Sequence, residues 1–200
     1  MSVLTLPVPI PPSGPRRKRW TVKQFHAIWE QGWLNDCRPA LLDGEIVEMP
    51  DPGPLHNMSV TLGDYALKNL FSTGFVVRVQ IPLVLSLWTD PVPDLAVVRG
   101  VPQDFVDNPT SAVLVVEAAD SSLATDLGEK TALYAATGIE DYWVIDLQNR
   151  QLIVHRDPMP DKVDLFRSIY RDVRTLQEAD DMQPLAAGSV IRVADLLPRR

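Results

Sequence analysis

The sequence has few cysteines, few histidines and no long apolar stretch, and each shortage argues against a class of protein. Its single cysteine, Cys37, cannot form an internal disulfide, so we expect a cytoplasmic protein. No apolar run approaches the ~20 residues that cross a bilayer, so no membrane contact is expected. His26 and His155 are expected at the surfaces of a helix and a strand, without acids or cysteines around them, which argues against a zinc site.

Positive charge is scarce as well. The chain has 19 Lys and Arg residues against 26 Asp and Glu residues, and its formal net charge is −7 at pH 7. This balance argues against a protein that coats nucleic acid through a broad basic face. It leaves open a local basic groove or a phosphate bridged by a metal ion.

Apolar residues, in contrast, are plentiful. They make up 46% of the 200 residues, against 22% charged residues, which is typical of a globular protein with one domain. Residues 1–19 contain five prolines and the basic cluster "RRKR", and we expect them to form a flexible arm, either a solvated tail or a contact for phosphate. The single domain is expected over residues 20–200.

Hydrophobic spacing gives the order of the secondary-structure elements. Helices are predicted over residues 22–33, 56–71 and 123–137, the last of which ends at Gly138. "ALLDGEIVEM" predicts a hairpin that turns at Asp43-Gly44. Strands are predicted for "FVVRVQIPLVLS", with a bulge or edge position at Pro82, and for "DLAVVRG", "AVLVVEAA", "DYWVIDL", "QLIVHRD" and "FRSIYRDV". This order favours a mixed α/β (α+β) fold in which helices pack on a mixed sheet.

Two of the apolar strands carry an acid. Asp94 opens the run "DLAVV", and Glu117 lies near the end of "AVLVVEA". A carboxylate without a partner is costly in an apolar interior, and two carboxylates at one point repel unless a cation neutralises them. If the two strands are neighbours, their acids converge at the rim of the sheet. A hard divalent ion, Mg²⁺ or Mn²⁺, would suit such oxygen ligands, although each acid alone is more typical of a cap or a surface residue.

A lysine follows on the next helix, in "LATDLGEKTALYAAT". Lys130 falls between Leu133 and Tyr134 on the helical wheel, on the face expected to pack on the sheet. It either extends along the sheet to reach solvent or reaches the two acids, where it would activate a water or stabilise charge on a phosphate. Asp126, four residues earlier, forms an ordinary helix ion pair or belongs to the same site.

Several spaced motifs together resemble the Uma-two family of endonucleases, within the PD-(D/E)XK nuclease superfamily. The stretches that carry this resemblance lie in order between about residues 21 and 197: "LLDGEIVEMPDPGPLHN", "VRVQIPLVL", "PVPDLAVVRG" and "LVVEAADSSLATDLGEKTALYAATGIEDYWVIDL". The resemblance implies a restriction-endonuclease-like mixed central sheet flanked by helices, with an N-terminal helix and hairpin.

The resemblance also implies a set of site residues. Asp94 matches the aspartate of the PD element, and Glu117 matches the acid of the (D/E)XK element. The lysine expected two residues later is replaced by Ala119, and Lys130 on the following helix would supply that charge. The backbone carbonyl of Ala118 would be a further metal ligand.

Three upstream positions match the family as well. The resemblance implies that Glu45 and His56 belong to the catalytic set and that Gln80 is an accessory polar residue beside it. Glu45 is otherwise an exposed hairpin residue, and His56 is otherwise a helix N-terminal residue without a role.

The sequence therefore predicts a Mg²⁺- or Mn²⁺-dependent endonuclease that hydrolyses phosphodiester bonds in nucleic acid, with DNA favoured. The alternative is a catalytically inactive module of the same fold, with a binding or regulatory role, because the net charge is negative and no DNA-reading element is evident. A homodimer, formed through exposed apolar strands, is also predicted.

Overall fold

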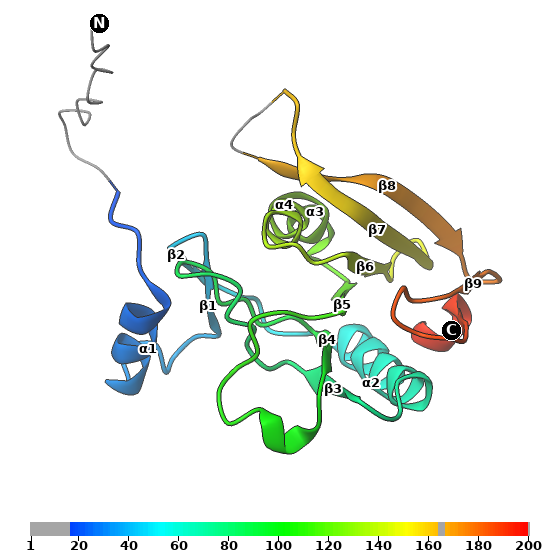
Figure 1. The fold of residues 1–200 in the computed structure, drawn as a ribbon, viewed down its shortest axis with the longest axis horizontal. Coiled ribbons are helices and arrows are strands. Elements are labelled where there is room, and N and C mark those ends of the chain that lie inside the picture. Colours follow the sequence, from blue (N-terminus) through cyan, green and yellow to red (C-terminus); the bar gives the residue numbers. More distant parts are fainter. Residues whose placement is uncertain (1–16, 164–166, 200) are drawn as a thin grey trace, which may run out of the picture.

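The computed structural model describes residues 17–163 and 167–199 (Figure 1). The helices of this part of the chain are α1 (Val22–Glu30), α2 (Pro54–Leu70), α3 (Leu123–Thr125) and α4 (Thr131–Ala136), with a π-helical turn (Asp126–Lys130) between the last two. The strands are β1 (Pro39–Leu42), β2 (Glu45–Glu48), β3 (Phe75–Val79), β4 (Leu95–Arg99), β5 (Leu114–Ala119), β6 (Asp141–Asp146), β7 (Gln151–Pro160), β8 (Ser168–Gln177), β9 (Asp181–Met182) and β10 (Ile191–Arg192). Two 3₁₀ turns, Pro102–Asp104 and Val193–Leu196, complete the set.

Six strands form the central sheet, in the order β3-β4-β5-β6-β7-β8. All neighbours are antiparallel except β5 and β6, which run parallel. A parallel pair needs a crossover connection, and the helical segment from α3 to α4 provides it. This mixed sheet with helices packed on it confirms the predicted fold class.

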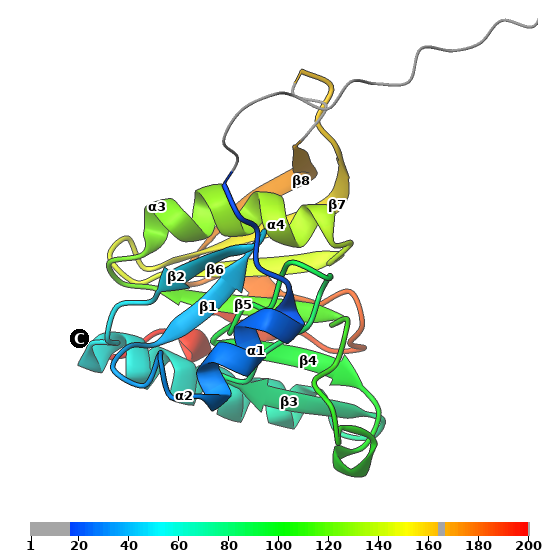
Figure 2. The same cartoon turned by 90° about the vertical axis from the view of Figure 1, so that its left-hand side faces the viewer.

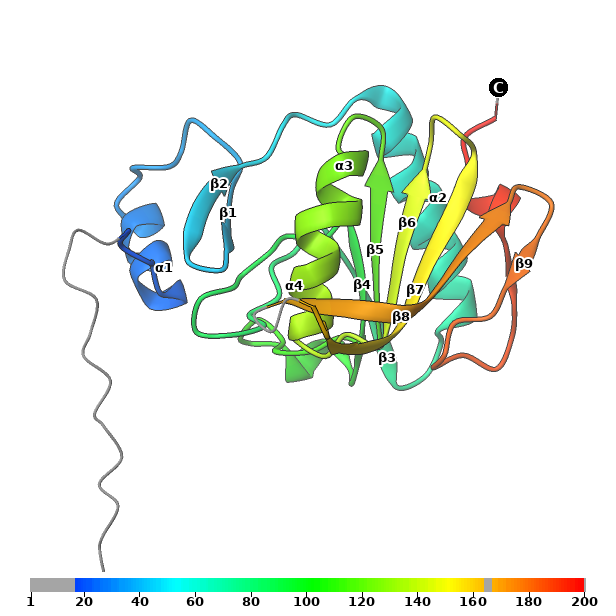
Figure 3. The ribbon, with the colours of Figure 1, turned by 90° about the horizontal axis from the view of Figure 1, so that it is seen from above.

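Helices cover both faces of the sheet, as Figures 2 and 3 show. The segment from α3 to α4 lies on one face, where Leu133 and Tyr134 pack against alternate residues of β5 and β6. Helix α2 lies on the other face together with the C-terminal segment, and its Leu67 belongs to a second core cluster with Val116 and Trp143. Because β5 and β6 are buried on both faces, they are mostly apolar in sequence and do not alternate between apolar and polar residues.

The predicted N-terminal elements are also present. Thr21 and Gln24 form the capping box that begins α1. The hairpin of β1 and β2 turns at Asp43 and Gly44, both of which have positive φ, as this two-residue turn requires. Helix α1 and the hairpin lie side by side at one side of the sheet (Figure 3).

Four predictions from the sequence need correction. The helix predicted over residues 123–137 contains a π-helical turn. The strand predicted to continue through Pro82 ends at Val79, because Gln80 adopts a φ of 51°, outside the range of a strand. His155 is 5% exposed and packs between Tyr142 and Tyr170, so it is a core residue. The helix predicted over residues 22–33 ends at Glu30.

The predicted arm lies mostly outside the described residues, which begin at residue 17. Its last residues contact the hairpin, since the Arg19 guanidinium pairs with Asp43 and lies over the Trp88 ring. Among residues 17–163 and 167–199, no helix has both the length and the apolar character that a membrane span needs.

Candidate active site

The two predicted acids meet where β4 begins and β5 ends. Asp94 directly precedes β4, and its carboxylate accepts a hydrogen bond from the backbone N–H of Ala118 on β5, at 2.9 Å. The register pairs Leu95 with Val116, so Asp94 lies beside Glu117 on the neighbouring strand. Both acids are buried, at 8% and 2% exposed. The sheet therefore brings together two carboxylates that are 23 positions apart in the sequence.

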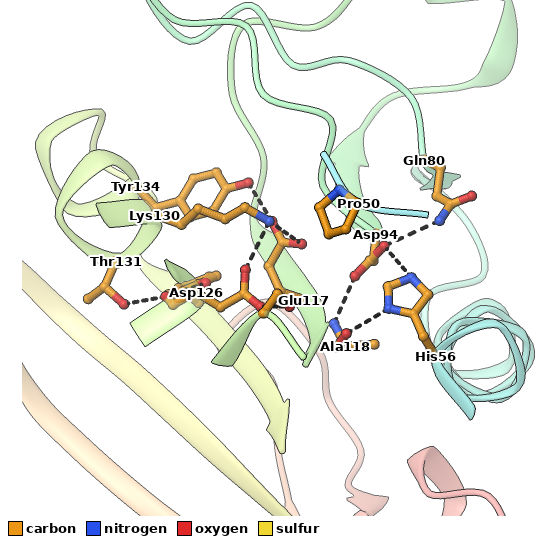
Figure 4. Close-up of polar contacts among 12 residues, drawn as sticks. Pro50, His56, Gln80, Asp94, Glu117, Ala118, Asp126, Lys130, Thr131 and Tyr134 are labelled. Carbon is orange, nitrogen blue, oxygen red and sulfur yellow. Dashed lines mark hydrogen bonds and ion pairs between the residues drawn. The ribbon is translucent and has the colours of Figure 1, made fainter. Parts of the chain in front are cut away.

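Glu117 is enclosed by residues of the crossover helix (Figure 4). Its Oε2 lies 3.0 Å from Lys130 Nζ, and its Oε1 accepts a hydrogen bond from the Tyr134 hydroxyl at 2.8 Å. Lys130 Nζ also lies 2.9 Å from Oδ1 of Asp126. All four side chains are buried, so Lys130 is an ammonium group held between two buried carboxylates. We call Glu117, Asp126, Lys130 and Tyr134 the Glu117 cluster.

The π-helical turn positions this cluster. A π turn leaves a backbone carbonyl without its usual α-helical donor, and such turns are frequent at functional sites. Here the carbonyl of Asp126 accepts hydrogen bonds from the Thr131 hydroxyl at 2.8 Å and from the Tyr142 hydroxyl at 2.9 Å. Tyr142 belongs to β6, so its hydroxyl ties the π turn to the sheet. This bond fixes the helix at the point where Asp126 and Lys130 reach toward Glu117.

Asp94 has a different set of partners, which come from separate parts of the chain. His56, in the first turns of α2, places Nε2 at 3.0 Å from Asp94 Oδ1 and Nδ1 at 2.8 Å from the carbonyl oxygen of Ala118. Gln80, just after β3, donates to the same Oδ1 at 3.3 Å. The Nε2–Oδ1 contact has the distance of an ion pair without the alignment of a hydrogen bond. We call Asp94, His56, Gln80 and the backbone of Ala118 the Asp94 cluster.

The surroundings of His56 favour its charged form. A carbonyl oxygen only accepts, so Nδ1 must carry a hydrogen, and Nε2 faces a carboxylate. The contact with Asp94 accordingly raises the pKa of His56, although partial burial opposes the rise. Burial by itself would raise the pKa of Asp94, but His56, the Ala118 N–H and Lys130 together hold the pKa of that carboxyl below its usual value. Asp94 is therefore ionised at neutral pH.

The Glu117 cluster has the opposite balance. Burial raises the pKa of Glu117 to about 8. The attraction of Lys130 opposes this rise, and the repulsion of Asp94 and Asp126 adds to it. Burial would lower the pKa of Lys130, but its two carboxylate neighbours raise it, so the ammonium stays charged. Burial also raises the pKa of the Tyr134 hydroxyl, which stays protonated and donates to Glu117. The cluster thus has two acids and one fixed cation, and Glu117 holds a proton near neutral pH.

The oxygen atoms at this rim have the chemistry that a hard divalent ion needs. Asp94, Glu117 and the Ala118 carbonyl supply oxygen donors on adjoining strands, which suits Mg²⁺ or Mn²⁺. However, no group of three or more His, Cys, Asp or Glu side chains is placed to hold a metal within the described ranges. His56 and Lys130 contact these oxygens instead. The donor set fits a divalent ion if His56 and Lys130 give up part of their contacts with these oxygen atoms.

A cavity of about 400 Å³ opens onto this rim. Five residues predicted for the site line it: His56, Gln80, Asp94, Glu117 and Lys130. Three others do not. Asp126 lies behind Lys130, and the Ala118 carbonyl faces the His56 ring. Glu45, on β2, is exposed and pairs with Arg17, so the structure does not bring it to the other acids.

Sequence reasoning missed Tyr134, Thr131 and Tyr142 as supports of the site. Tyr134 lies four residues after Lys130 on the same helix face, so the helical wheel that located the lysine could also have located the hydroxyl. Thr131 and Tyr142 could not have been located, because their role depends on the π turn and no residue pattern marked that turn.

Comparisons with known proteins agree with this architecture. Residues 23–193 match the model of the Uma2 family, which is described as "Putative restriction endonuclease". A solved structure from Anabaena variabilis, described as a "putative nuclease belonging to DUF820", shares the fold, with a TM-score of 0.62 and 15% sequence identity. The alignment covers 88% of this chain and 96% of that one. No match is found among curated proteins.

Proposed function

The chain belongs to the Uma2 family. From this membership and from the paired acids of the site, we propose that it is an endonuclease that depends on a divalent metal ion. It would hydrolyse phosphodiester bonds in nucleic acid, with DNA favoured. The observation that supports the proposal most is the shared cavity, in which acids from two adjacent strands lie with a buried lysine. A nuclease needs this combination of anionic ligands and a fixed cation, whereas a purely structural ion pair needs no cavity.

Each residue has a proposed role. Asp94 and Glu117, with the Ala118 carbonyl, would hold a divalent ion, which supplies a Lewis acid for the phosphoryl oxygen and lowers the pKa of a bound water. Lys130 keeps its proton and would orient the attacking water or stabilise charge on the phosphate. Tyr134 and Asp126 hold Glu117 and Lys130 in place. His56 and Gln80 would orient the Asp94 carboxylate.

A plasmid-nicking assay tests this function. We expect the wild type to convert supercoiled DNA to nicked circles with Mg²⁺ or Mn²⁺ and to lose this activity with a chelator. Asp94→Asn should lower the rate at least 100-fold, while Asp64→Asn, which changes an acid paired with Lys68 on α2, should not. Failure to cut DNA or RNA of any form with either ion would refute the proposal, as would full activity in Asp94→Asn.

One observation favours the second candidate, a non-catalytic module of the same fold. Each acid already has a basic partner from the protein, His56 for Asp94 and Lys130 for Glu117, so the charges are balanced without a metal. Calorimetric titration with Mn²⁺ separates the two candidates. Heat of binding that disappears in Asp94→Asn supports the enzyme, and no heat in the wild type supports the module.

The predicted cytoplasmic location and the predicted homodimer are part of the same proposal. Light scattering at several protein concentrations measures the dimer directly, and a constant monomer mass would refute it.

A further inference from the structure

The cavity of the candidate active site is lined by residues that the proposed chemistry does not use. Besides the acids, His56 and Lys130, the lining includes residues from α1, the hairpin and the loop that follows it, and we call these the outer part of the cavity. They include Arg38 and Asp51, but most have apolar or aromatic surface: Trp29, Pro39, Met49, Pro50 and Pro52. A cavity lined by both charged and apolar side chains fits a ligand that has both kinds of surface.

Trp29 gives the outer part an aromatic surface. It lies at the end of α1, 38% exposed, with its ring 5.7 Å from the ring of Phe25, which is 1% exposed. The buried Phe25 thus supports one region of the indole, and the remainder faces the cavity or solvent. An exposed aromatic ring with a fixed support is the kind of surface on which nucleobases stack.

Arg38 gives the same region a cation. It directly precedes β1, and its guanidinium donates to the carbonyl oxygen of Pro50 at 3.0 Å. That acceptor is neutral, and a guanidinium has five N–H donors, so charge and donors remain for another ligand. A phosphate is a suitable ligand, because guanidinium groups bind phosphate oxygens in a bidentate manner.

We infer that the outer part of the cavity binds one unpaired nucleotide of the substrate, with its base on Trp29 and a phosphate at Arg38. The substrate would then be single-stranded nucleic acid, or a duplex in which a nucleotide is unpaired beside the bond that is cut. This inference rests on the proposed nuclease function and names its substrate class.

Size and charge favour an unpaired nucleotide over an intact duplex. A volume of about 400 Å³ lies near the small end of ligand pockets, which span ~300–1,000 Å³, and it suits one nucleotide but not stacked base pairs. In a duplex each base is paired and stacked, so Trp29 would have no base face to contact. A net charge of −7 also gives little attraction for the many phosphates of a long duplex.

Binding measurements test the inference independently of cleavage. Fluorescence anisotropy would follow a labelled 20-nucleotide DNA strand, the same strand in a duplex, and a duplex with one bulged nucleotide, all with Ca²⁺ as the divalent ion. We expect the single strand and the bulged duplex to bind about 10-fold more tightly than the perfect duplex. Trp29→Ala should remove about 10-fold of the affinity for the first two. Arg38→Gln should weaken all binding and reduce its salt dependence by about one phosphate contact.

Trp33→Ala is the matched control. Trp33 lies four positions after Trp29, beyond the end of α1. Its side chain is 74% exposed and does not line the cavity. It should bind all three DNAs as the wild type does, and Trp29→Phe should restore most of the affinity lost in Trp29→Ala. Circular dichroism would establish that each variant is folded.

The outcomes separate the inference from the proposed function. Equal affinity for all three DNAs, or equal losses in Trp29→Ala and Trp33→Ala, would overturn the inference, even if the wild type cuts DNA. Binding of the single strand through Trp29 without any cleavage would support the nucleotide site and refute the nuclease.

Discussion

The Asp94 cluster and the Glu117 cluster adjoin where β4 begins and β5 ends, yet they are built differently. All members of the Glu117 cluster lie within 17 positions of Glu117 in the sequence, and each is less than 5% exposed. The Asp94 cluster joins four separate segments, and its longest contact, from His56 to Ala118, spans 62 positions. His56 lines the cavity, as Glu117 and Lys130 do. The first cluster is therefore built within one short stretch of chain, and the second depends on contacts between distant segments.

The largest expected effect comes from removing the cation of the Glu117 cluster. Lys130→Met would remove the cation between two buried carboxyl groups, and we expect it to lower the free energy of unfolding by about 3–5 kcal/mol at pH 8. Urea denaturation measures this loss. Lys68→Met is the control, because Lys68 forms an exposed pair with Asp64 at the same helical spacing and should lose at most about 0.5 kcal/mol. Equal losses in the two variants would mean that Lys130 does not stabilise the cluster.

Double-mutant cycles test whether the two clusters are energetically separate. His56→Gln and Asp94→Asn, within one cluster, should show a coupling energy of about 1–3 kcal/mol. His56→Gln and Tyr134→Phe, which belong to different clusters, should be additive within about 0.5 kcal/mol. A strong coupling in the second cycle would contradict the division and would show that the site responds as one unit.

The pH dependence should report mainly on the Glu117 cluster. The pKa of Glu117 is about 8 in the folded protein against 4.5 for a free side chain, so the folded state keeps a proton that the unfolded chain releases. The free energy of unfolding should therefore fall as pH rises from about 4.5 to about 8, by at most about 1.4 kcal/mol per pH unit. His56, with a raised pKa, adds a slope of the same sign above pH 6.5.

Thermal denaturation without divalent ions, at pH values from 5 to 8, measures this slope. Glu117→Gln should remove the part of the slope below pH 6.5 and keep the part due to His56. A wild type whose stability rises across this range would show that Glu117 is ionised in the folded state.

The smallest expected effect comes from the support of the π-helical turn. Tyr142→Phe removes one of the two hydrogen bonds to the Asp126 carbonyl, so we expect a loss of about 1 kcal/mol. Tyr65→Phe, which changes a tyrosine that is 71% exposed, should have no effect. Urea denaturation compares the two. An unchanged stability in Tyr142→Phe would mean that the Thr131 hydroxyl alone satisfies this carbonyl.

The sequence predicted the architecture because its signals were local. The Asp43-Gly44 turn and the apolar runs of β4 and β5 each depend on neighbouring residues, and each is confirmed. The adjacency of Asp94 and Glu117 was predictable for the same reason, since Asp94 directly precedes β4 and Glu117 lies on β5, the next strand in the chain.

Other features could not be predicted from local patterns, because they depend on packing between distant segments. The π turn needs the Tyr142 hydroxyl from another strand, and no local pattern encodes that contact. The burial of His155 follows from its place between two tyrosine rings, although its strand neighbours gave the pattern of a surface position. The family resemblance pointed to Glu45, but the hairpin places this side chain beside Arg17 at the surface.

The parallel pairing of β5 and β6 also has a consequence for the order of folding. The crossover that this pairing requires carries the lysine, so Glu117 meets its cation within a single strand–helix–strand unit. Closing this loop costs less entropy than bringing His56 on α2 to Ala118 on β5, a contact that spans 62 positions, and short-range contacts form early. We therefore expect pulsed hydrogen exchange to protect the amides of β5 and β6 early in folding. Glu117 would then be neutralised as soon as it is buried, and the chain would avoid an intermediate with an unpaired charge in its core.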